Sequence, residues 1–197
     1  MFACHAQAAD AVKMGVRAGF RILYHCTHAD TETLDLLEAH KDTLFVGPAV
    51  GLLYTRLHEA DALGITRDVA VKSGAVAGFE RTLRLYPEMR KRGIRVLPGG
   101  DYGFPYNPIG TNARDLEWFV KFFGYSPTET LVAATKLGGE LMGRGPNGDQ
   151  LIGQLKPGYL ADVLVVAKDP IQDVRVLQDK LNLTMIMKDG AFHKRPQ

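Results

Sequence analysis

The stretch ILYH, residues 22–25, is a short apolar run that ends in a histidine, and the first half of the chain repeats this design. Met1–Cys4 leads to His5 in the same way, and Ile94–Gly100 leads to Asp101. Apolar runs of this length, bounded by turn residues, are typical of buried β-strands. Each run is therefore predicted to be a strand that carries one titratable side chain at its C-terminal end.

Helical patterns separate these strands. Apolar residues recur at helical spacing over residues 7–19, 32–40 and 78–92, and Leu44–Val46 is predicted to be one more strand. Strands separated by helices predict a parallel sheet, because a crossover helix is what joins parallel neighbours. In α/β barrels the side chains at the C-terminal strand ends share one mouth, so His5, His25 and Asp101 are expected to meet there.

The pattern changes after two further predicted helices, over residues 112–123 and 127–142. Ser126 is a capping residue followed by proline, which favours a helix start at that point. Beyond the glycine-rich segment 145–149, Ala161–Val166 and the residues around an Asp-Gly turn near 189 are predicted to be short β-strands. The chain is thus expected to contain an α/β part and a smaller β part.

Composition narrows the class of protein. The 197 residues are 46% hydrophobic and 23% charged, with a net charge of +2 and no cluster of basic residues, so no nucleic-acid partner is expected. No apolar run reaches the ~18 residues that suggest a membrane span. Two cysteines are too few for a disulfide framework, which favours a reduced, cytoplasmic setting by default.

Two imidazoles and a carboxylate are ligand types of a divalent metal centre, most often zinc. A single histidine at a strand end is more often a hydrogen-bonded structural residue, so the prediction depends on His5, His25 and Asp101 converging. A Cys₂His₂ zinc site that uses Cys4 and Cys26 is disfavoured, because neighbouring residues on a strand point to opposite faces.

The sequence around these residues resembles the metal-dependent amidohydrolase superfamily, near its imidazolonepropionase-like and prolidase-like branches. The motifs that carry the resemblance are YHCTH (24–28), LPGGDYG (97–103), GTNARDL (110–116), AATK (133–136) and GQLKPGYLAD (153–162). They occur in order along nearly the whole chain, and together they are far more specific than any one of them.

The resemblance implies an α/β fold that is only the C-terminal portion of such a protein. Residues 1–148 would form strands 5–8 of a TIM-type (β/α) barrel, and residues 149–197 would form part of a composite β-sandwich. A complete barrel takes roughly 250 residues. The family's His-x-His pair of strand 1 is absent from this sequence, and so is the segment that would carry its strand-4 lysine.

The resemblance also implies site residues and an activity. His5, His25 and Asp101 match metal ligands, and Asp101 is in addition the proton-transferring catalytic residue. His28 and Tyr102 are expected to bind substrate because they lie close in sequence to these residues. The complete enzyme would hold one or two divalent ions, most often zinc, and would hydrolyse C–N bonds in small amide, carbamate, urea or dipeptide-like substrates.

The alternative is a non-catalytic remnant, or a subunit that needs a partner polypeptide to complete the barrel. A half barrel would expose strand edges and apolar surface, which promote association. Self-association or a complementing half-barrel is therefore expected.

Overall fold

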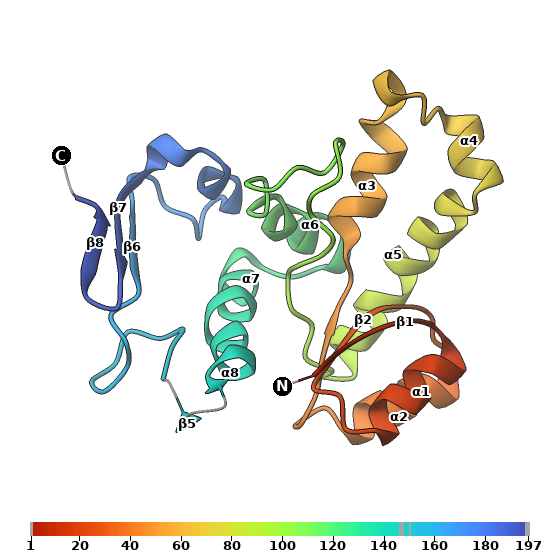
Figure 1. Ribbon diagram of the computed structural model, residues 1–197, viewed down its shortest axis with the longest axis horizontal. Coiled ribbons are helices and arrows are strands. Elements are labelled where there is room, and N and C mark those ends of the chain that lie inside the picture. Colours follow the sequence, from red (N-terminus) through yellow and green to blue (C-terminus); the bar gives the residue numbers. More distant parts are fainter. Residues whose placement is uncertain (1, 146–147, 150, 196–197) are drawn as a thin grey trace.

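The computed structural model describes residues 2–145, 148–149 and 151–195 (Figure 1). Its N-terminal part alternates strands and helices, as the sequence predicts. The elements are β1 (Ala3–Ala8), α1 (Ala9–Arg17), β2 (Ile22–His28), α2 (Thr31–Ala39) and β3 (Phe45–Gly47). The three strands form a parallel sheet in the order β1-β2-β3. The α/β class predicted from the sequence is therefore confirmed.

The predicted strand over Ile94–Leu97 does not extend this sheet as a full strand. It contributes one parallel bridge, between Val46 and Val96, which is supported by hydrogen bonds from the Leu97 amide to Val46 O and from the Val46 amide to Arg95 O, both 2.9 Å. Pro98 follows and has no N–H with which to continue the ladder. Within the described residues the parallel sheet thus has three strands, and it does not by itself establish a half barrel.

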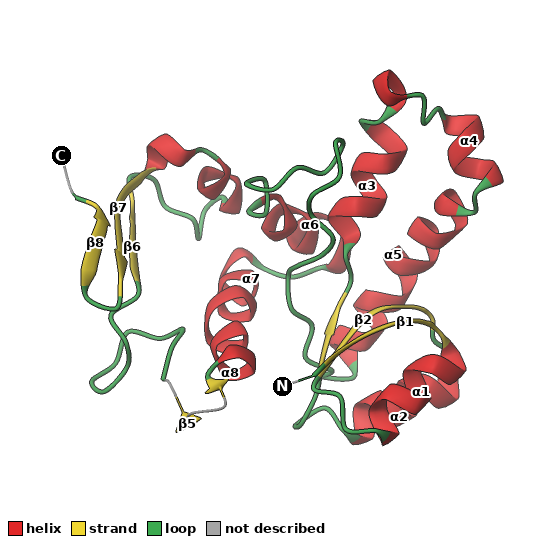
Figure 2. Ribbon diagram, in the orientation of Figure 1, coloured by secondary structure: helices red, strands yellow, loops and turns green. Residues whose placement is uncertain are grey.

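Helices, together with a long loop over residues 98–113, make up the remainder of this part (Figure 2). The helices are α3 (Val50–His58), the 3₁₀ turn η1 (Asp61–Leu63), α4 (Arg67–Lys72), α5 (Ala75–Lys91), α6 (Arg114–Phe123), α7 (Pro127–Val132), a π-helical turn (Ala133–Leu137) and α8 (Gly138–Met142). The helix predicted over residues 127–142 is continuous but contains the π-helical turn.

Two helix starts show how local sequence sets these bounds. The Asp30 side chain accepts a hydrogen bond from the Thr33 amide at 2.8 Å and caps α2. Ser126 and Glu129 form a reciprocal capping box at the start of α7, with proline at the first helical turn. Each cap satisfies backbone N–H groups that have no partner inside the helix.

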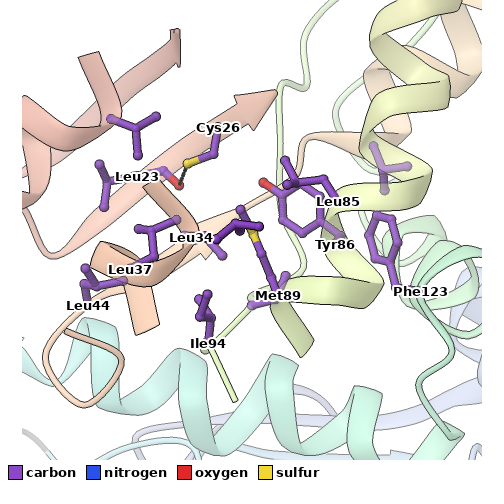
Figure 3. Packing of buried hydrophobic residues seen from close by; sticks show 14 of the residues in the cluster. Leu23, Cys26, Leu34, Leu37, Leu44, Leu85, Tyr86, Met89, Ile94 and Phe123 are labelled. Atoms are coloured by element: carbon purple, nitrogen blue, oxygen red, sulfur yellow. Dashed lines mark hydrogen bonds between the residues drawn. The ribbon is translucent and has the colours of Figure 1, made fainter. Parts of the chain in front are cut away.

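The main hydrophobic core lies between the parallel sheet and its helices (Figure 3). Leu23 of β2, Leu37 of α2, Tyr86 and Met89 of α5, and Phe119 of α6 are completely buried. The apolar stripe predicted along residues 78–92 is therefore core. Burial of apolar side chains of this size stabilises a fold by about 1.5–3 kcal/mol each.

The C-terminal part contains β4 (Arg144–Gly145), β5 (Gly148–Asp149), β6 (Val163–Val166), η3 (Val174–Gln178), η4 (Lys180–Asn182), β7 (Leu183–Lys188) and β8 (Ala191–Lys194). The composition of the glycine-rich segment 145–149 predicts a loop, whereas β4 and β5 at its two ends pair with each other, and residues 146–147 lie outside the described residues. β6, β7 and β8 form an antiparallel sheet. The predicted Asp-Gly hairpin is confirmed, with Asp189 and Gly190 both at positive φ.

In the described ranges, the structure has no helix that combines the length and the apolar character needed to cross a membrane.

Candidate active site

The two candidate histidines lie within strands rather than at their ends. β1 continues past His5 to Ala8, and β2 continues past His25 to His28, so the prediction that each histidine closes its strand is wrong. The strands remain paired beyond the histidines, although the ladder is irregular there: His25 and Cys26 have positive φ angles of 74° and 49°. The regular register ends at the pair Ala6–His25, and pairing resumes beyond it.

The structure nevertheless brings the three predicted side chains together. His5 Nδ1 lies 3.2 Å from His25 Nε2, and the two ring centroids are 4.3 Å apart. Asp101 Oδ2 lies 3.5 Å from His25 Nε2. His25 is thus the central member, between an imidazole of β1 and a carboxylate of the loop that follows Leu97.

The environments of the three groups differ. The His25 side chain is only 7% exposed, whereas that of Asp101 is 35% exposed and His5 is exposed. Burial lowers the pKa of His25, and His5 acts in the same direction, while Asp101 opposes the shift. A lowered pKa favours the neutral imidazole, which is the form that binds a metal ion.

Tyr24 is a neighbour that the sequence analysis did not select. Burial raises the pKa of its hydroxyl, and the negative charge of Asp101 raises it further. Its position directly before His25 in the YHCTH motif is the signal that could have identified it. The Tyr24 hydroxyl therefore stays protonated beside the Asp101 carboxylate.

The donor atoms match a metal centre in type and, in part, in spacing. Two ligand atoms bound to zinc at about 2.1 Å in tetrahedral geometry lie about 3.4 Å from each other. The measured separations from His25 Nε2, 3.2 Å and 3.5 Å, bracket that value. However, among the residues that the structure describes, no group of three or more His, Cys, Asp or Glu side chains could by itself hold a metal ion. The donor chemistry fits, but a closed ligand set is not formed.

The cysteines stand apart from these donors. Cys4 Sγ packs against Gly15 of α1, and Cys26 is completely buried with its thiol directed to Leu23 O at 4.0 Å. Burial raises the pKa of the Cys26 thiol to about 12, so it remains protonated. This thiol is not in the form that ligates zinc.

The two predicted substrate-binding residues contact helices. His28, the last residue of β2, is exposed, and its Nδ1 is in close contact with the Arg81 guanidinium of α5. Tyr102 is half-buried, and its hydroxyl lies 3.5 Å from Asn112 O, just before α6. Burial, followed by the charge of Asp115, raises the pKa of the Tyr102 hydroxyl.

Asp115 is a buried acid that the sequence analysis also missed. It is 1% exposed, and burial raises its pKa to about 6, although the Tyr102 hydroxyl and the Gly99 amide oppose the rise. Its Oδ1 and the Tyr102 hydroxyl both lie close to Gly51, where a side chain would meet them. Gly99 and Tyr102, which belong to the loop that carries Asp101, therefore lie beside the buried carboxyl group of Asp115.

No family model matches the chain. Ochratoxinase of Aspergillus niger is 28% identical over 192 residues, which cover 98% of this chain but 38% of that protein. The crystal structure of A. niger ochratoxinase superposes with a TM-score of 0.82 at 25% identity, over 98% of this chain and 41% of that one.

Two further solved structures share the fold at lower identity. An Xaa-Pro dipeptidase with methionine bound in its active site has a TM-score of 0.79 at 22% identity, over 98% of this chain and 44% of that chain. Molinate hydrolase has a TM-score of 0.69 at 16% identity, over 96% and 42% of the two chains.

The structural neighbours of this chain are thus amidohydrolase- and prolidase-like proteins, which it matches over their C-terminal part. The family resemblance predicted from the motifs is confirmed. The similar proteins are named hydrolases, and this chain spans about two fifths of their length, 38% for the curated relative.

Proposed function

We propose that this chain is the C-terminal portion of a metal-dependent hydrolase of C–N bonds. The observation that carries the proposal is the convergence of His5 Nδ1, His25 Nε2 and Asp101 Oδ2, with separations of 3.2 Å and 3.5 Å. In this proposal residues 1–148 are half of a (β/α) barrel, strands 5–8, and residues 149–197 are part of a composite β-sandwich.

His5, His25 and Asp101 would supply part of the ligand set, and the remaining ligands would come from outside this sequence. The exposure of His5 supports this division, because a ligand facing solvent leaves room for further donors. The ion would be divalent, most often zinc for imidazole and carboxylate donors, with one or two ions in the complete enzyme.

Each side chain has a distinct chemical task in the proposal. A bound divalent ion would supply a water of pKa about 7 and would polarise a carbonyl group. Asp101 is partly exposed, so its carboxylate can accept a proton from water and deliver it to a departing nitrogen. His25 is kept neutral by burial, so its Nε2 lone pair is available to a metal. His28 and Tyr102 would contact the substrate.

The substrate class is a small molecule with an amide, carbamate, urea or dipeptide-like C–N bond. Ochratoxinase, an Xaa-Pro dipeptidase and molinate hydrolase are the similar proteins that support this range. Loops at the barrel mouth set specificity in such folds, so a partial chain does not select among these substrates.

A second candidate function, a subunit or a non-catalytic remnant, is supported by the incomplete ligand set within the described residues. Exposed apolar side chains point the same way, including Phe2, which is 75% exposed beside β1, and Leu164, which is 57% exposed on β6. The partner would be a complementing half-barrel or a second copy of the chain.

Titration with Co²⁺, followed by visible absorption, tests the proposal. The wild-type chain should bind Co²⁺, and His5→Ala, His25→Ala and Asp101→Asn should each weaken binding at least tenfold. His193→Ala is the matched control, because His193 is an exposed histidine of β8 and should leave binding unchanged. Equal binding by all four variants would contradict the ligand assignment, and no binding by the wild type would favour the remnant.

A further inference from the structure

We propose that two buried side chains outside the ligand set, Tyr86 and Asn107, are positioning residues that fix the backbone of His25 and Asp101. The Tyr86 hydroxyl donates a hydrogen bond to His25 O at 2.9 Å, and Asn107 Nδ2 donates one to Asp101 O at 2.6 Å. The inference rests on the proposed function, in which His25 and Asp101 are metal ligands. It deepens that function by naming the residues that set the distance between these two ligands.

The backbone at His25 needs such support. His25 and Cys26 are consecutive non-glycine residues at φ 74° and 49°. Left-handed backbone costs an L-residue roughly 1–2 kcal/mol, and it persists where the surrounding structure imposes it. The Tyr86 hydrogen bond fixes the first peptide of this segment, and a 2.9 Å bond from the Ala29 amide to Cys26 O fixes the next. The turned backbone then directs the His25 ring toward His5 and Asp101.

Tyr86 is itself rigidly held. It is completely buried in α5, and its ring stacks on Phe123 of α6, with centroids 5.2 Å apart and planes at 26°. Figure 3 shows the ring beside Phe123, with its oxygen toward the side on which Cys26 lies. Packing accounts for the ring but not for the hydroxyl, because phenylalanine would fill the same space without burying a polar group. The hydroxyl is explained by its bond to His25.

Asn107 has the same positioning role for Asp101. It is 1% exposed and lies in a loop closed by hydrogen bonds from the Gly103 amide to Asn107 O and from the Asn107 amide to Phe104 O, both 2.9 Å. Its side chain therefore reaches Asp101 O from a fixed backbone. On the other side of Asp101, Gly99 O accepts a 3.2 Å hydrogen bond from the Ala49 amide. The position of Asp101 relative to His25 is thus set from both directions.

The test compares Tyr86→Phe and Asn107→Ala with two matched controls in the full chain. Tyr125→Phe removes the hydroxyl of a tyrosine that follows α6 and packs on Phe119. Asn182→Ala removes a buried amide that donates to Val176 O at 2.8 Å, far along the sequence from the ligands. Two quantities are measured: the dissociation constant for Co²⁺, and the nuclear Overhauser effect between the His5 and His25 rings in metal-free protein.

Loss of a residue that hydrogen-bonds to a metal ligand typically weakens metal binding 10- to 100-fold. We expect the dissociation constant to rise about tenfold in Tyr86→Phe and Asn107→Ala, and to stay within about twofold of wild type in both controls. Unchanged affinity in the two test variants, or an equal loss in the controls, overturns the inference.

A wild-type chain that binds no Co²⁺ would defeat the proposed function without deciding this inference. The ring-to-ring signal then decides it, because the two rings have centroids only 4.3 Å apart. Its loss in Tyr86→Phe with retention in Tyr125→Phe supports the positioning role, and its retention in both overturns it.

Discussion

The two three-stranded sheets of this chain differ in what covers them. In the parallel sheet, β3 is buried throughout, and five of the seven residues of β2 are buried. In the antiparallel sheet, none of the residues of β6, β7 and β8, all of which are described, is buried. Both sheets are rich in apolar residues, so composition does not account for the difference. Helices α1, α2 and α5 pack on the first sheet, whereas the second lies at the far side of the molecule, away from that core (Figure 1).

One of the three candidate ligands, His5, lies where the first sheet is less completely covered. The edge strand β1 has one buried residue, Ala6, and its His5 is exposed. The described part of the chain thus contains a buried core beside the parallel sheet, a partly open site next to β1, and an antiparallel sheet with no buried residue in its strands. Stability should therefore depend on the first sheet and very little on the second.

The largest contrast is expected between two leucines on strands. Leu23 of β2 is completely buried, and Leu164 of β6 is 57% exposed. Leu23→Ala should lower the free energy of unfolding by about 2–5 kcal/mol, because it removes core contacts and leaves a cavity. Leu164→Ala should change it by less than about 0.5 kcal/mol. Urea denaturation of both variants measures the two values, and similar losses would mean that the second sheet has a core after all.

The next largest effect is expected in the pH dependence of the free energy of unfolding, to which the buried Asp115 contributes. The pKa of Asp115 rises from 3.8 to about 6 on folding. Between these values the unfolded chain has lost the proton that the folded chain keeps, so the stability of the folded state falls as pH rises from about 4 to about 6. The full penalty, present above that range, is about 3 kcal/mol. Asp115→Asn should remove this slope from the unfolding free energies measured at pH 4 and pH 7, and the same slope in the variant would refute the assignment.

A substitution in the loop that carries Asp101 should have an intermediate effect on stability. A side chain on Gly100 would lie 2.4 Å from Ala49 Cα, a backbone atom, whereas one on Gly78 of α5 would meet nothing within 4 Å. Gly100→Ala should cost about 1–3 kcal/mol through overpacking and should weaken Co²⁺ binding. Gly78→Ala, the control, should stabilise the chain by about 0.5–1 kcal/mol. Thermal unfolding and metal titration test both variants. If Gly100→Ala changes neither the stability nor the affinity for Co²⁺, the loop can move to make room for a side chain.

The smallest expected change in stability accompanies a change in association. Leu164→Lys places a charge on the exposed face of β6 and should alter the unfolding free energy by less than about 0.5 kcal/mol. It should raise the monomer fraction in sedimentation velocity, because a charge on an exposed strand opposes edge and face pairing. An unchanged distribution would locate any self-association elsewhere, for instance at β1.

Sequence patterns predicted much of the fold because periodicity and caps act locally. Ser126 caps a helix start as the sequence predicts, and the helical stripe through Tyr86 is buried. Strand ends were less well predicted. β1 and β2 run past their histidines because pairing between neighbouring strands, rather than local composition, determines where a strand stops.

The sequence predicted which three side chains converge at the candidate site, but it did not predict the residues that hold their backbone in place. His25 and Asp101 stand in motifs that a family resemblance can locate, and His5 follows an apolar run like theirs. The structure brings the three side chains together. Tyr86 and Asn107 act through single hydrogen bonds to backbone carbonyls. Such bonds depend on the left-handed backbone at His25 and on the closure of a loop, and neither leaves a periodic or compositional signal.

Anomalous diffraction at the zinc edge, from crystals of the chain grown with Zn²⁺, would locate an ion bound by these three side chains. We expect a peak about 2.1 Å from both His5 Nδ1 and His25 Nε2, which now lie 3.2 Å apart, with Asp101 Oδ2 turned toward it. A peak bound only by other residues, or none beside His25 at full Zn²⁺ concentration, would contradict the assignment of these three side chains to a metal centre.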